Sequence, residues 1–446
     1  MTIDTTRRDD NLLMLDAKCA KRTASRGARS RAATAAIWLG CAVVSAIPMA
    51  TTASAHVKWF VTCNASDDPL PPQAVFTPTF WLFSALFVTV LYVGCAIEQT
   101  KLGASLSELL DRWTEPLHRR TDGLLRAVAA VSFTLLWADG DCILTPELKG
   151  SGIWLSAIQV LIPIYLIARA TLPAAAAGIL VLYGYGVATD GLFHMLDYPF
   201  FLGLAAYFAL SISHNAKLRA FRFDCLRWTV ALSLMWPSME KFLYPSWIAP
   251  ILAQHPELTL GIDVGTVITA AGVVEFGLAF ALFWTPLVRR FAAAALALLL
   301  FSATFDFGKM DGIGHLMIIA LLLLVFADPG RKQASCRPAV APLVGGTTLL
   351  AVIFLYAGFH TLYYGASPAA LVPLASGAAL AVLAVGFLCL PGLAHGLRRA
   401  IRRRLLLWLI ERDEAGDTLT VQRPRELARP RPVTRSERLV AVRAHG

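Results

Sequence analysis

Two aspartates and a histidine, Asp190, His194 and Asp197, form the first motif whose residue types and spacing could support chemistry. If the segment is helical, spacings of four and three residues place all three side chains on one face. Two carboxylates beside an imidazole can hold it as a cation, orient it as a proton carrier, or bind a metal ion with it. The alternative is a segment at the membrane edge whose polar side chains face water.

A second motif runs from Asp306 to His315, between two apolar stretches. Asp311 and His315 are four residues apart and can share one face of a helix. In a structural interpretation, Asp311 caps that helix and Lys309 neutralises Asp306. In a functional interpretation, His315 at the start of an apolar helix forms an acid–base pair with Asp311, and both interpretations stay open.

A third motif places Glu240 and Lys241 shortly after Pro237, and the proline should kink the span. Adjacent residues do not face each other on a helix, so Glu240 and Lys241 should have different partners. The lysine can alternatively extend to the surface. Trp236 and Tyr244 flank the pair and are the candidate cofactor contacts.

Glu275 lies near the middle of a later apolar stretch. An acid at the bilayer centre costs on the order of 2.5–3.5 kcal/mol on insertion scales. It must therefore be protonated, paired or turned towards a polar cavity. The functional interpretation is a proton relay or a contact to a quinone headgroup, and the alternative is a neutral carboxyl hydrogen-bonded between helices.

A possible copper site involves His56, which follows the small-x-small sequence Ala53-Ser54-Ala55 of a signal-peptidase site. Cleavage there would give His56 a free amine, and the amine and imidazole together could chelate copper with a second histidine. The candidate second ligands are His194, His255, His315 and His360. Without that role, the segment is an amphipathic stretch held at the interface by Trp59 and Phe60.

A membrane-embedded helical bundle has to position these motifs. The chain has 446 residues, of which 57% are hydrophobic and 16% charged, whereas a soluble domain is about a quarter charged. Apolar stretches long enough to cross a bilayer recur, and helices satisfy their own backbone hydrogen bonds in lipid. We predict an all-α polytopic bundle with twelve spans, or eleven after cleavage: 32–50, 76–97, 124–142, 152–168, 170–189, 198–213, 228–247, 263–288, 291–308, 312–328, 342–363 and 368–391.

The loops between these spans alternate in charge. Arginine is confined to one set, while the other set carries Lys58, Lys149 and Lys309 and no arginine. The positive-inside rule then places the acids and histidines at the outer face of a bacterial inner membrane, with a cytoplasmic C-terminus. It also explains the net charge of +10 without a nucleic-acid partner. Residues 98–123 should form an amphipathic helix on the inner surface.

One part of the chain resembles a known family. Arg227 opens a span that ends near Glu240-Lys241-Phe242, the next span contains Glu275 in Ala271–Leu278, and Gly312-Ile313-Gly314-His315 follows. Over residues 227–330 this pattern is similar to the four-helix DoxX/DoxD-type membrane proteins. The resemblance implies a quinone-linked or sulfur-linked redox role, or a partnership with a redox enzyme.

The leading hypothesis is a membrane oxidoreductase component that binds quinone and membrane lipid. Its catalytic residues would be Glu240, Lys241, Glu275, Asp306, Asp311 and His315. The alternative is copper binding or cation transport by His56, Asp190, His194 and Asp197. A third option is an assembly partner of a redox complex. The expected segments are a leader with a signal peptide or first span (1–55), an N-terminal bundle (56–213), a DoxX-like segment (214–330), a helix pair (331–395) and a basic interfacial helix with a disordered tail (396–446).

Overall fold

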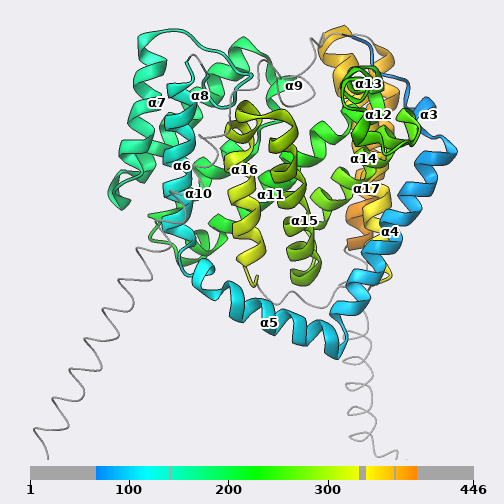
Figure 1. The fold of residues 1–446 in the computed structure, drawn as a ribbon, viewed down its shortest axis with the longest axis horizontal. Coiled ribbons are helices and arrows are strands. Elements are labelled where there is room, and N and C mark those ends of the chain that lie inside the picture. Colours follow the sequence, from blue (N-terminus) through cyan, green and yellow to red (C-terminus); the bar gives the residue numbers. More distant parts are fainter. Residues whose placement is uncertain (1–66, 141, 331–337, 366–367, 389–446) are drawn as a thin grey trace, which may run out of the picture. The chain divides into compact units, whose positions relative to one another are not determined.

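The structure, a computed structural model, describes residues 67–140, 142–330, 338–365 and 368–388 (Figure 1). Across these ranges the regular elements are helices, and the only β-type pairing is an isolated bridge between Cys142 and Lys149. Eight described helices are long and apolar enough to cross a membrane. The predicted all-α polytopic bundle is confirmed. The predicted span 32–50, His56 and the tail 396–446 lie outside the described residues.

Eleven of the twelve predicted spans correspond to described helices. The eight long ones are α4 (Pro78–Glu98), α6 (Thr121–Ala138), α8 (Leu172–Thr189), α14 (Val264–Ala281), α15 (Pro286–Phe307), α16 (Lys309–Ala327), α17 (Val340–Gly365) and Leu371–Leu388. Two shorter apolar helices are α7 (Ile153–Tyr165) and α10 (Phe200–Ser211). The eleventh is α11 (Ala216–Ser238), whose first half is charged.

The span predicted at 228–247 is divided in the structure. Helix α11 ends one residue after Pro237, and two short helices follow, α12 (Glu240–Leu243) and α13 (Pro245–Gln254). Proline lacks the N–H that would continue the hydrogen-bond ladder, so a helix end near it is expected. The break places Glu240 and Lys241 on a separate short helix instead of on the long span.

Two apolar clusters form the core of the described bundle. One joins α6, α7, α8, α10, α11, α15 and α16, and the other joins α4, α12, α14 and α17 with the end of α11. Leu234, Phe283 and Val288 pack against both clusters. All described helices belong to one compact unit, with α10 packed along α11, so the expected segments 56–213 and 214–330 pack against each other.

Helix α5 (Lys101–His118) runs across the end of the bundle opposite α9 (Leu192–Met195) and α13 (Figure 1). Its inner face buries Gly103 and Thr114 against the bundle. Its outer face exposes Leu102, Leu109 and Trp113. A helix with one face on protein and a second apolar stripe exposed has the character expected of a helix at a membrane surface.

Candidate functional site

A cavity of about 250 Å³ lies between α11, α14, α15 and α16, beside α12. We call it the acid–base cavity, because four carboxylic acids, a lysine and a histidine line it: Asp197, Glu240, Glu275, Asp311, Lys241 and His315. Most of the remaining wall is apolar, including Leu296, Leu299, Leu300 and Ile318. The sequence predicted only that these acids and bases lie towards the same end of the bundle. The structure shows that they line one cavity.

Lys241 and Glu275 form an ion pair within this cavity. The Lys241 Nζ lies 2.7 Å from Glu275 Oε2, and the two side chains keep 15% and 28% of their accessible surface. Glu275 is thus paired inside the bundle, one of the three states that its depth required. The alternative in which Lys241 extends to surface water is not what the structure shows.

Glu240 has a different partner from its neighbour Lys241, as predicted. The carboxylate is almost fully buried, and its Oε1 accepts a hydrogen bond from the Tyr356 hydroxyl at 3.4 Å. Tyr356 belongs to an aromatic cluster, with ring centroids 4.7 Å from Trp236 and 6.4 Å from Tyr244. Trp236 and Tyr244, the predicted cofactor contacts, therefore pack against the partner of Glu240 and are not among the residues that line the cavity.

Asp311 and His315 share a helix face at the start of α16. Asp311 Oδ1 lies 3.0 Å from His315 Nδ1, and both residues are buried. Asp311 lies in the first turn of α16, and its partner there is the His315 ring. Lys309 lies 3.7 Å from Asp139, and the side chain of Asp306 falls outside the described part of the structure.

The motif of Asp190, His194 and Asp197 does not share one helix face, so that prediction is wrong. Gly191 adopts φ +90, a conformation that favours glycine, and it separates α8 from the one-turn helix α9. Asp190 is exposed and accepts a hydrogen bond from Thr189. His194 Nε2 lies 2.8 Å from Glu147 Oε1, while Asp197 lines the acid–base cavity.

The four candidate copper-binding histidines have separate surroundings. His315 pairs with Asp311 and His194 with Glu147, while His360 lies in the aromatic cluster around Tyr356. His255 pairs with exposed Glu257 at 3.1 Å. The pKa of the Glu257 carboxyl lies below its usual value because its own backbone N–H and the His255 ring bind it. The described residues contain no cluster of three or more His, Cys, Asp or Glu suited to a metal ion, and His56 lies outside them.

Glu147 and Tyr198 were not predicted from the sequence. The Tyr198 hydroxyl donates to Glu147 Oε2, and Tyr198 is also one of the residues that line the cavity, so this residue connects the cavity to the Glu147–His194 pair. Glu147 lies on a buried loop that Gln159 of α7 holds by donating to the Ile143 carbonyl at 3.1 Å. A glutamine within an apolar span requires a buried hydrogen-bond partner. Gln159 was therefore the one sequence feature that indicated an ordered polar segment packed against α7.

A second hollow of about 260 Å³ lies where α4 and α14 begin. Polar side chains line much of it, among them Thr77, Thr266 and the N-cap residue Asp263. Lys241 lines this threonine-lined hollow and the acid–base cavity alike. The Lys241–Glu275 pair therefore lies at the boundary between the two spaces.

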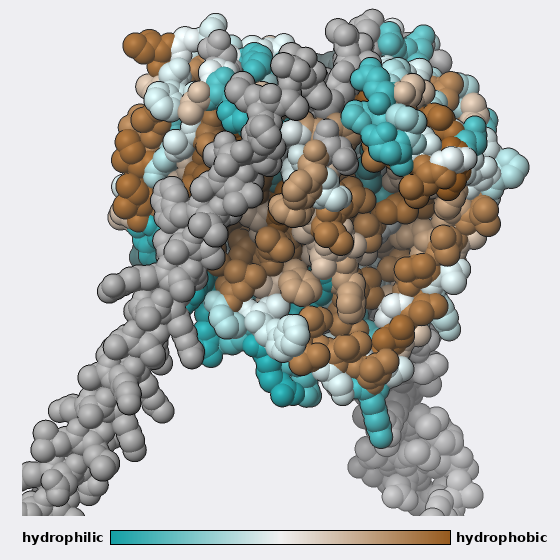
Figure 2. All heavy atoms as spheres, viewed as in Figure 1, coloured by the Kyte–Doolittle hydropathy of each residue, from teal (hydrophilic) through white to brown (hydrophobic). Residues whose placement is uncertain are grey.

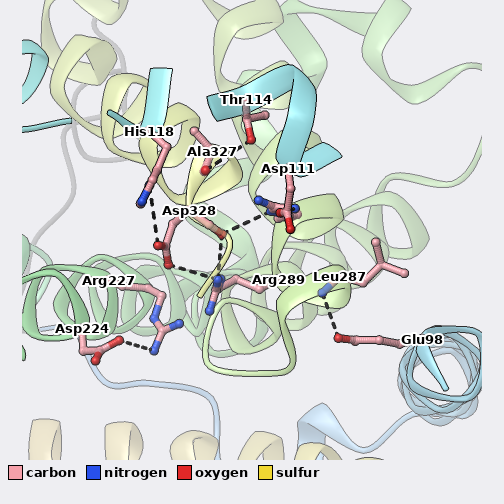
Figure 3. Close-up of polar contacts among 11 residues, drawn as sticks. Glu98, Asp111, Thr114, His118, Asp224, Arg227, Leu287, Arg289, Ala327 and Asp328 are labelled. Atoms are coloured by element: carbon pink, nitrogen blue, oxygen red, sulfur yellow. Dashed lines mark hydrogen bonds and ion pairs between the residues drawn. The ribbon is translucent and has the colours of Figure 1, made fainter. Parts of the chain in front are cut away.

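Three buried arginines form a separate polar cluster near α5 (Figure 3). Arg289 donates to the Asp328 carbonyl at 2.9 Å and pairs with its carboxylate at 3.1 Å. Arg290 pairs with Asp111 of α5 at 2.7 Å, and Arg227 pairs with Asp224 at 2.9 Å. The sequence assigned these arginines to inner loops or a span edge, and long-range packing buries them.

This arginine cluster joins α5 to the bundle. Figure 3 shows that Asp328 pairs with Arg289 and also with His118 of α5. The His118 ring nitrogen lies 3.9 Å from the Asp328 carboxylate. Thr114 of α5 also donates to the Ala327 carbonyl at 3.3 Å. Because Arg290 pairs with Asp111 of α5 and also donates to the Asp328 carbonyl, the cluster is best explained as a structural attachment of α5.

Comparison of the chain with known protein families, with curated proteins and with solved structures finds no match. The function therefore has to be argued from the geometry of the acid–base cavity.

Proposed function

We propose that this protein is a membrane redox protein, related to the DoxX type, that transfers hydrogen from a thiol or other sulfur reductant to a quinone. One observation supports this most strongly. Four carboxylates, a lysine and a histidine converge on one cavity whose remaining wall is largely apolar. An apolar wall suits the ring of a quinone, and the ionisable groups suit its two oxygens.

The charges of the cavity favour an exchange of protons. Asp197, Glu240, Glu275 and Asp311 face one lysine and one histidine. Surplus negative charge beside apolar side chains is costly, so a cavity of this composition favours protons or cations. It is therefore suited to a reaction in which protons arrive or leave with electrons.

The proposed reaction balances without a further oxidant. Two thiols lose two electrons and two protons as their disulfide forms, and the quinone gains both to become a quinol. The carboxylates would accept protons from the thiols, while Lys241 and His315 would donate to the quinone oxygens. The ion pairs with Glu275 and Asp311 would orient these two donors.

Lys241 also supports a route for protons to the surface. It lines the threonine-lined hollow as well as the cavity and pairs with Glu275, so its position suits the passage of protons between the two spaces. From the arginine distribution, we propose that this end of the bundle faces the periplasm and that the C-terminus is cytoplasmic. A redox enzyme on that side would be the natural partner.

The test is quinone reduction by the purified full-length protein in lipid nanodiscs, with a dithiol or sulfide as donor. We expect donor-dependent quinol formation that Lys241→Met and Glu275→Gln each reduce strongly. Asp190→Asn is the matched control, because Asp190 is exposed and outside the cavity wall. Absence of both bound quinone and quinone reduction with every sulfur donor would contradict the proposal.

The second candidate function is cation binding or transport, which the surplus of carboxylates in the same cavity favours. Metal analysis of the purified protein together with N-terminal sequencing distinguishes its copper form. A mature N-terminus at His56 with stoichiometric copper would support it, and a retained leader would eliminate it.

A further inference from the structure

An apolar groove of about 510 Å³ runs between α4, α14 and α15. Its wall consists entirely of hydrophobic side chains and glycines, including Val90, Val274, Leu278 and Ala295. Figure 2 shows that the surface over α15 and α4 is predominantly hydrophobic. The groove extends along α15 from Leu287 to Ala295, which at 1.5 Å per helical residue is about 12 Å.

The groove adjoins the acid–base cavity on two of its helices. On α14, Val274 lines the groove and the next residue, Glu275, lines the cavity. On α15, Ala295 lines the groove and Leu296 lines the cavity. Leu278, one helical turn from Glu275, also lines the groove, so part of the groove wall lies within one helical turn of the Lys241–Glu275 pair.

Two glycines shape the groove by allowing large side chains to come close. A Cβ on Gly277 would lie 2.7 Å from the ring of Phe87, and a Cβ on Gly94 would lie 3.2 Å from Val288. Any larger residue at Gly277 would push Phe87 away from α14. These glycines therefore let α4 pack closely on α14 and α15 while the hollow beside them stays open.

We infer that the groove binds the isoprenoid side chain of the quinone whose ring occupies the acid–base cavity. This inference rests on the proposed function and narrows its substrate to a long-chain membrane quinone. A ligand with a polar ring and a long apolar chain matches a polar cavity adjoining an apolar groove, because each part meets surroundings of its own polarity. A water-soluble quinone without a chain would leave the groove unused.

The test uses a decyl benzoquinone with a photoreactive diazirine at the end of its chain, added to the full-length protein in nanodiscs. After illumination, we expect labelled peptides from α4, α14 and α15, with labelling suppressed by excess unlabelled decyl benzoquinone. Ala295→Trp, an exposed position on the groove wall, should reduce that labelling by about tenfold, which corresponds to about 1.4 kcal/mol.

Leu298→Trp is the matched control, because it places the same side chain on α15 at a position 69% exposed and outside the groove wall. It should leave the labelling unchanged. Val90→Trp on the opposite wall repeats the test if Ala295→Trp does not fold. If excess quinone suppresses no labelling in α4, α14 or α15 while quinone reduction persists, the inference is wrong and the proposed function stands. If quinone neither binds nor is reduced, both are wrong.

Discussion

The ammonium group of Lys241 lies 2.7 Å from the carboxylate of Glu275, and the two residues come from different helices, α12 and α14. Each residue by itself would be an unfavourable charge in an apolar bundle. Together they form a polar boundary between the acid–base cavity and the threonine-lined hollow. Loss of either charge should therefore affect the proposed proton route as well as the stability of the protein.

Lys241→Met should destabilise the protein by about 1–3 kcal/mol, because it leaves the partly buried Glu275 carboxylate without its hydrogen-bonding cation. Replacing both residues, as Lys241→Met with Glu275→Leu, should restore much of that loss since no charge then remains unpaired. Unfolding curves of the four proteins in detergent form a double-mutant cycle. If the double variant loses as much stability as the two single variants added together, the pair does not interact.

Tyr356→Phe should cost about 1–2 kcal/mol of stability, because it removes the hydroxyl that donates to buried Glu240. The ring itself, and its contacts to the aromatic cluster, would remain. Tyr92→Phe is the control, since Tyr92 is 46% exposed and should change stability little. A thermal unfolding midpoint for Tyr356→Phe equal to that of the control would contradict the importance of this hydrogen bond.

Arg290→Met should loosen helix α5 from the bundle, because it removes the ion pair to Asp111 and the bond to the Asp328 carbonyl. Hydrogen exchange in the backbone of Lys101–His118 should become faster. Arg112→Gln is the control, because the Arg112–Glu108 pair is largely exposed and such pairs contribute about 0–1 kcal/mol. Unchanged exchange in α5 of Arg290→Met would exclude the attachment role of the arginine cluster.

Gly191→Ala should destabilise the protein by about 1–2 kcal/mol, because a side chain at φ +90 is strained. The new Cβ would also lie 2.6 Å from the Tyr363 hydroxyl. Gly184→Ala in α8 is the matched control, since nothing lies within 4 Å of its Cβ position and alanine favours helix. Comparable unfolding curves for the two alanine variants would show that the turn between α8 and α9 tolerates a side chain.

The amino-acid sequence alone determined the membrane-spanning helices, because a run of apolar residues long enough to cross lipid has few alternatives. It also allowed the pairing of Asp311 with His315, since a four-residue spacing on one helix is a local relationship, and the structure chose this pair over the capping alternative. The motif around His194 had the same local spacing but failed, because Gly191 ends the helical conformation between its members.

Only the tertiary structure decided which distant residues meet. Lys241 with Glu275, Glu240 with Tyr356, and the arginine cluster with α5 all join elements far apart in the chain. Helix periodicity states which residues share a face, but it does not specify which helix packs against that face. The packing of two apolar clusters across α11, α14 and α15 makes that choice and so creates the cavity between them.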